Sequence, residues 1–164
     1  MNMENVKFAD GRKLLEHFRK AAVKLKYPKI KVNIGQDNKL VMYLAGVRSK
    51  NLGGIEINNG YSFGDPDSIF YGRVLPNGAV QFTYRAVSNP AIADTINAII
   101  ADPIGTAKVI GQRTGHCIFC SRELTDAKSI FHGYGPVCAE NFGLPWGDKP
   151  NSTDANIANK LEEI

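Results

Sequence analysis

All three cysteines of this 164-residue chain, Cys117, Cys120 and Cys138, fall within 22 consecutive positions. Cys117 and Cys120 have the two-residue spacing of a zinc knuckle, in which a tight turn brings two thiolates to one tetrahedral metal. An odd number of cysteines argues against a disulfide framework and favours free thiols that can act as ligands. We therefore predict a zinc site, and a closed tetrahedral site needs a fourth ligand.

His132 is the predicted fourth ligand. With it the segment reads C-x2-C-x11-H-x5-C, which is close to the spacing of Cys2His2 fingers with a cysteine in the last place. Two glycines and Pro136 fall between the last two ligands and would break a finger helix. We expect instead a treble-clef-like or short ribbon arrangement, with a brief helix from Pro136 to Gly143. His116 is the rival ligand, although adjacent ligands strain each other's geometry.

The pattern Cys-x2-Cys-x-Arg-x-Leu-Thr-Asp, then Ser, then Gly-Tyr-Gly-Pro-Val-Cys-Ala runs from Cys117 to Ala139. Over roughly residues 113–147 the chain resembles an uncharacterised family of small bacteriophage and bacterial proteins with a three-cysteine zinc-finger-like module. The resemblance implies a phage or mobile-element origin and a metal module, and it implies no settled activity. The family's recurrent features are the cysteines and the Gly-x-Gly-Pro turn, which leaves Asp126, His116 or a water as further candidates for the fourth ligand.

Hydrophobic periodicity predicts an α+β fold. Asp10 can cap a helix that runs to about Lys26 with one apolar stripe. "KIKVNI" and "KLVMYLA" predict a hairpin around a turn at 36–38, and "GGIEINNG", "SIFYGRV" and "AVQFTYRAV" predict three further strands. Helices are expected from Pro90 and from Pro103 through Val109. The result is a small antiparallel sheet with an N-terminal helix and a short zinc-binding module.

We divide the chain into three parts. Residues 1–112 form the predicted α+β domain, residues 113–147 the zinc-finger-like module, and residues 148–164 a polar linker with a C-terminal helix. The first residues contain no signal peptide and no segment approaches the ~20 apolar residues that span a membrane. We therefore expect a cytoplasmic protein, in the host cytoplasm if a phage encodes it, with no membrane partner.

Positive charge is concentrated at the N-terminus. The chain carries a net charge of +4, whereas residues 1–35 hold nine Lys or Arg against three Asp or Glu, which gives +6. Such a surface attracts phosphate regardless of base sequence, although a charged arc is also what any solvated helix shows. We predict binding of DNA or RNA through the cations of the first helix: Arg12, Lys13, Arg19, Lys20 and Lys24.

Two other functions compete with nucleic-acid binding. The first is a protein-binding inhibitor of a host enzyme or defence complex, in which zinc only holds the fold. The second is an enzyme with three thiolates and a water on zinc, for which Glu123 or Glu140 would be the general base. The chain lacks the His-x-Glu and Pro-Cys-x2-Cys pairing of zinc deaminases, so a structural zinc is favoured over a catalytic one.

Overall fold

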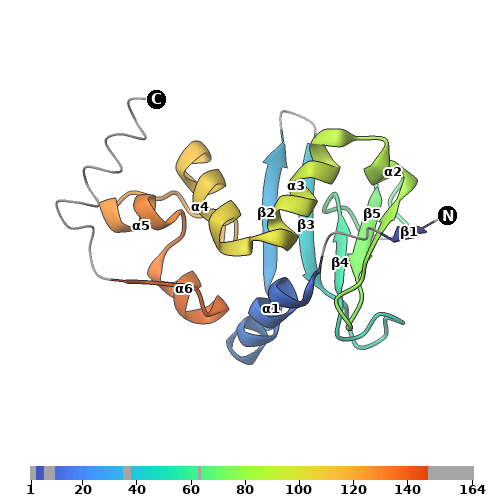
Figure 1. Cartoon of the computed structure of the whole chain (residues 1–164), viewed down its shortest axis with the longest axis horizontal. Helices are drawn as coiled ribbons and strands as arrows, with labels where there is room; N and C mark the ends of the chain where they lie inside the picture. Colours follow the sequence, from blue (N-terminus) through green and yellow to red (C-terminus); the bar gives the residue numbers. More distant parts are fainter. Residues whose placement is uncertain (1–2, 6–9, 35–37, 63, 148–164) are drawn as a thin grey trace.

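The computed structural model describes residues 3–5, 10–34, 38–62 and 64–147 (Figure 1). Positions 36 and 37 of the predicted turn, and the predicted linker and C-terminal helix at 148–164, lie outside the described residues. The strands are β1 (Met3–Asn5), β2 (Lys29–Ile34), β3 (Asn38–Leu44), β4 (Ile55–Asn58), β5 (Phe70–Val74) and β6 (Val80–Thr83). The helices are α1 (Arg12–Lys24), α2 (Tyr84–Val87), α3 (Pro90–Ala101), α4 (Pro103–Thr114), α5 (Ala127–His132) and α6 (Pro136–Phe142).

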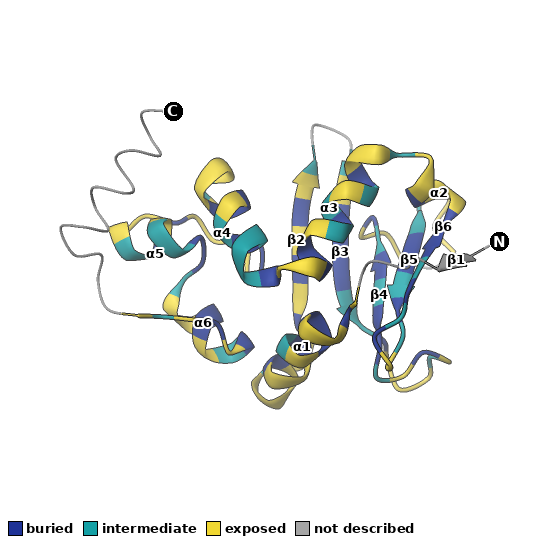
Figure 2. Ribbon diagram, in the orientation of Figure 1, coloured by how far each residue is buried: buried dark blue, intermediate teal, exposed yellow. Residues whose placement is uncertain are grey.

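The six strands form one antiparallel sheet in the order β1-β6-β5-β4-β3-β2. Residues alternate between its two faces: Ile30 and Val32 of β2 are buried, whereas Lys29 and Lys31 are exposed (Figure 2). The register places Ile30 opposite Met42, and Met42 opposite Ile57, so the apolar residues share one face. The predicted α+β fold with a small antiparallel sheet is confirmed.

Helices α1 and α3 lie across the apolar face of the sheet (Figure 1). Their buried residues recur at helical spacing and join the sheet in one hydrophobic cluster: Leu14, Leu15, Phe18 and Ala21 of α1, and Ile92, Ile96, Ile99 and Ile100 of α3. The stripe predicted for the first helix is therefore the surface that forms the core. The opposite arc of α1 faces solvent and carries its cations.

Several boundaries differ from the sequence prediction. The predicted strand through Val87 ends at Thr83 and is followed by helix α2 from Tyr84; the Thr83 hydroxyl lies 2.7 and 3.2 Å from the carbonyl oxygens of Phe70 and Tyr71 in β5. Helix α4 continues beyond Val109 to Thr114, where Gly115 ends it with a φ of 77°. Helix α1 begins at Arg12 and ends at Lys24, so Gly11 and not Asp10 is the N-cap residue; the Asp10 carboxylate accepts the backbone N–H of Arg12 at 3.0 Å.

The cysteine-containing segment packs against the sheet and α1. The backbone N–H of Lys31 donates to the carbonyl of Ile118 at 2.8 Å, which joins the edge strand β2 to this segment. The His17 ring donates through Nδ1 to the carbonyl of Phe142 at 2.6 Å, and the Phe142 ring meets Phe18 edge-on. The predicted domain boundary at residue 112 falls within helix α4, and the division of the chain into domains stays a prediction.

Candidate metal centre

A tight turn holds Cys117 and Cys120 together. The backbone N–H of Cys117 donates to the carbonyl of Arg122 at 3.0 Å, and that of Ser121 donates to the carbonyl of Cys117 at 2.8 Å. Ser121 has a φ of 65°, and among the described residues no other non-glycine has a positive φ. A left-handed residue costs about 1–2 kcal/mol. The chain keeps it here because it reverses the backbone directly after the second cysteine.

The same turn aims backbone N–H groups at the sulfurs. The Phe119 N–H lies 3.4 Å from Cys117 Sγ, and the backbone of Arg122 contributes to lowering the pKa of the Cys120 thiol. Hydrogen bonds of this kind stabilise thiolates, which are the form of cysteine that binds metals. Each of these backbone contacts therefore favours the thiolate form of its cysteine.

The third cysteine comes from α6. Gly135 precedes this helix, Pro136 occupies its first turn, and Gly143 ends it with a φ of 66°, as the sequence predicts. Helix α5 ahead of it is capped by Asp126, whose carboxylate accepts the N–H of Ser129 at 3.1 Å. These short helices turn the chain back so that Cys138 reaches the other two cysteines.

The three sulfurs lie within 4.8 Å of one another. Tetrahedral zinc with Zn–S bonds of 2.3 Å would set its sulfurs about 3.8 Å apart, so the cluster can close around one ion with small adjustments. Cys117 and Cys138 are buried and Cys120 is exposed. Three cysteines that lie this close together can hold a metal ion.

Crowding controls the protonation of these thiols. Hydrogen bonds from Cys117 and Cys138 lower the pKa of Cys120 to about 2. The pKa values of Cys117 and Cys138 are raised, Cys117 by its hydrogen bond to Cys120 and Cys138 by those to Cys117 and Cys120, with burial adding to both shifts. One thiolate therefore forms readily, and a cation is needed before the other two ionise. Metal binding at this site would release protons.

The histidines and Asp126 lie outside the sulfur cluster. Among the described residues, the group of ligand atoms within 4.8 Å of one another contains the three cysteines alone. The His132 ring is stacked on Tyr134, with 5.7 Å between centroids, and tilted against Trp146 at 4.9 Å; burial lowers its pKa, as do Lys128 and Lys108. His116 Nδ1 lies 3.3 Å from the carbonyl of Ser121. The assignment of the fourth ligand to His132, His116 or Asp126 therefore stays a prediction.

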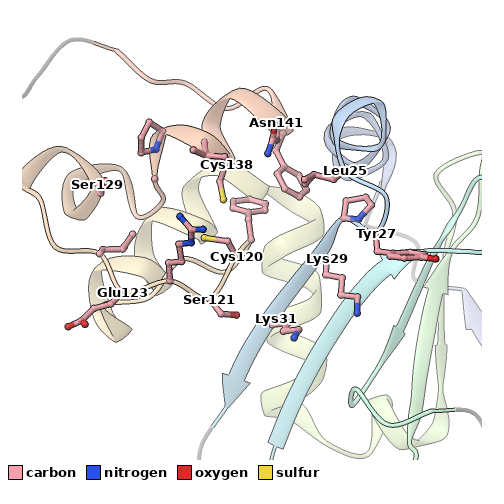
Figure 3. A pocket seen from close by; sticks show the side chains of 18 of the residues that line it. Leu25, Tyr27, Lys29, Lys31, Cys120, Ser121, Glu123, Ser129, Cys138 and Asn141 are labelled. Carbon is pink, nitrogen blue, oxygen red and sulfur yellow. The ribbon is translucent and has the colours of Figure 1, made fainter.

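A cleft of about 620 Å³ opens beside the cysteines. Figure 3 shows Cys120 and Cys138 on one side of it and the side chains of Tyr27, Lys29 and Lys31 on the other, at the start of β2. Cys120 is therefore reachable from solvent through a cleft with cationic side chains. Sequence reasoning placed these lysines on the basic N-terminus but had no signal that they would face the cysteines.

The five cations predicted to bind nucleic acid are all exposed on α1. Three have carboxylate partners: Arg12 with Asp10 at 2.5 Å, Lys20 with Glu16 at 3.4 Å and Lys24 with Glu140 at 2.7 Å. Arg19 donates to the carbonyls of Gly53 and Pro76 at 3.5 and 3.3 Å. Lys13 is the fifth of these cations. All five lie on one face of α1, and what they bind stays a prediction.

Residues 109–143 match a family described as "Family of unknown function (DUF6011)". The match begins in α4, ends at the glycine that terminates α6, and contains all three cysteines. No curated protein and no solved structure matches the chain. None of the described helices combines the length and the apolar character needed to cross a membrane. The match covers the segment that the cysteine spacing identified, and it assigns no activity to that segment.

Proposed function

We propose that the protein is a phage-type accessory protein that binds DNA or RNA and whose cysteine cluster holds a structural zinc. Zinc suits the donor set, because it accepts thiolates in tetrahedral sites, and two of the three sulfurs are buried as in a site that supports the fold. The observation that carries this proposal is the convergence of Cys117, Cys120 and Cys138 within 4.8 Å.

His132 is the proposed fourth ligand, with His116, Asp126 and water as its competitors. In the described arrangement the His132 ring belongs to an aromatic stack, so it would have to leave Tyr134 and Trp146 to reach the sulfurs. His132→Ala and His116→Ala form a matched pair for metal analysis. Loss of zinc from the first variant alone supports His132, and retention of zinc by both leaves Asp126 or water at the fourth position.

The cations of α1 supply the proposed nucleic-acid contact. Their ion pairs with Asp10, Glu16 and Glu140 are exposed, and exposed pairs contribute about 0–1 kcal/mol. Phosphate can therefore replace these carboxylates at little cost. Binding of this kind weakens steeply with salt, because each duplex phosphate contacted contributes about 0.9 to the slope of log affinity against log salt.

Fluorescence anisotropy with labelled DNA and RNA at several salt concentrations tests this proposal. The double substitution Lys13→Glu and Lys20→Glu should weaken binding and reduce the salt slope, whereas Arg19 is left in place because it donates to two loop carbonyls. Arg85→Glu with Arg113→Glu makes the same change of charge at exposed positions elsewhere. A wild-type protein that binds no nucleic acid at physiological salt would refute the proposal.

The alternative proposal is an inhibitor that docks on a host enzyme or defence complex. The feature that favours it is a set of exposed aliphatic side chains on the three helices around the cysteines: Val109 (60% exposed), Ile130 (43%) and Val137 (61%). Exposed apolar side chains supply contact area at protein-binding sites. Affinity capture from a host lysate with and without nuclease separates the two proposals, since a protein partner survives the nuclease and a nucleic acid does not.

A further inference from the structure

The face of the sheet that points away from α1 and α3 is basic. The strand register places Lys29, Tyr43, Glu56, Arg73 and Gln81 in one row across five strands. A second row contains Lys31, Val41, Asn58 and Phe70, and a third contains Asn33 and Lys39. These rows hold four cations and one carboxylate, a net charge of +3. We refer to these residues as the outer face.

The one carboxylate of the outer face is already engaged. Glu56 Oε2 lies 3.7 Å from Nε of Arg73, its neighbour in the row, and its side chain is only 13% exposed. In contrast to the largely buried Glu56, the side chains of Lys29, Lys31 and Lys39 are exposed on the neighbouring strands β2 and β3. The field near β2 and β3 is therefore positive, which favours a polyanion.

Aromatic rings accompany these cations. Tyr27, which directly precedes β2, is 73% exposed, and the Nζ of Lys26 lies 5.6 Å from the centre of its ring. Tyr43 and Phe70 are half-buried on the outer face, and the Arg73 guanidinium lies 5.0 Å from the centre of the Phe70 ring. Flat rings beside cations on a sheet suit unpaired bases, whose faces can stack while their phosphates meet lysines.

The outer face is continuous with the metal centre. Lys29 and Lys31 line the cleft whose far wall carries Cys120 and Cys138 (Figure 3), and Arg122 lines the same cleft. At the other side, Gly60 lies so close to Val41 that an added Cβ would come within 3.2 Å of its Cγ2, so the turn after β4 covers that part of the face. The accessible path therefore runs along β2 and β3 and into the cleft.

We propose that single-stranded nucleic acid binds along this path, with its phosphates on Lys29, Lys31 and Lys39 and its bases stacked on Tyr27 and Tyr43. The inference rests on the proposed nucleic-acid-binding function and adds a single-strand contact on the sheet to the proposed contact on α1. Duplex bases are already stacked on each other and cannot use the rings. A preference for single strands follows.

The test compares wild-type protein and three variants by anisotropy with a 20-nucleotide dT strand, a 20-nucleotide rU strand and a 20-base-pair duplex. Lys29→Glu with Lys31→Glu should weaken single-strand binding at least tenfold and lower the salt slope by about 1.4, at about 0.7 for each single-strand phosphate. Tyr27→Ala should weaken binding about tenfold without changing the slope, as one lost stack predicts. The dT and rU strands distinguish DNA from RNA.

Arg85→Glu with Arg113→Glu is the matched control, because it makes the same change of charge away from both α1 and the outer face, and all substituted side chains are exposed, so the variants should melt like wild type. The inference is supported if the sheet variants lose single-strand affinity and the Arg85 and Arg113 variant keeps it within about threefold, a margin typical of one removed surface contact. Intact single-strand binding by the sheet variants, or a wild-type preference for duplex, overturns it while the proposed function stands. Absence of any nucleic-acid binding by wild type overturns the proposed function itself.

Discussion

Substituting Phe142 by Ala tests whether the cysteine-containing segment and the sheet share one core. The Phe142 side chain is 1% exposed, and its ring centre lies 4.5 Å from that of Phe119 in the knuckle and 5.9 Å from that of Phe18 on α1. Truncating a buried Phe to Ala costs about 3–5 kcal/mol. At about 2–4 °C per kcal/mol for a chain of this size, a loss near 4 kcal/mol lowers the melting temperature by about 8–16 °C.

The assay is thermal and urea unfolding of metal-loaded protein, followed by circular dichroism. Phe131→Ala is the matched control: the ring is half-buried, faces the Lys108 Nζ at 4.3 Å, and should cost only about 1–2 kcal/mol. A loss from Phe142→Ala no larger than that from Phe131→Ala would refute the shared core. An unchanged melting transition of the sheet would show that the segment folds independently of it.

Three further predictions follow from the packing. Gly111→Ala should destabilise the protein by about 1–3 kcal/mol in urea unfolding, because the new Cβ would lie 2.2 Å from the carbonyl oxygen of Gly133, and this outweighs the gain in helix propensity. A chelator should make residues 113–147 sensitive to protease while the sheet stays protected; unchanged cleavage of that segment would count against a structural metal. A double-mutant cycle of Lys24 and Glu140 should give less than about 1 kcal/mol of coupling, since both side chains are exposed.

Local patterns predicted most of the fold. The alternation of Lys with Ile or Val in β2 and the stripe on α1 correctly identified the residues that form the core. Local sequence patterns did not predict the features that depend on long-range contacts. Strand β6 ends at Thr83, where helix α2 begins and the Thr83 hydroxyl contacts the carbonyls of β5, and a β-rich sequence through Val87 does not reveal this change. Strand β1 is only three residues long, too short for a periodicity signal.

The candidate site was predictable in part for the same reason. Cysteine spacing identified the three residues whose sulfurs converge, because the ligands of a knuckle are close in sequence. Ser121 carries no signal for its left-handed backbone, a conformation usually indicated by glycine or asparagine. Lys29 and Lys31 approach the cysteines through long-range contacts, among them the hydrogen bond between β2 and Ile118, which no local pattern encodes.

The metal content of the purified protein tests the central claim most directly. Native mass spectrometry of protein purified without added chelator should show one zinc per chain, bound with the loss of protons from Cys117, Cys120 and Cys138. Substitution of any one of these cysteines by Ser should reduce that zinc. A folded protein that carries no zinc, and whose three thiols all react freely with a thiol reagent, would contradict the account.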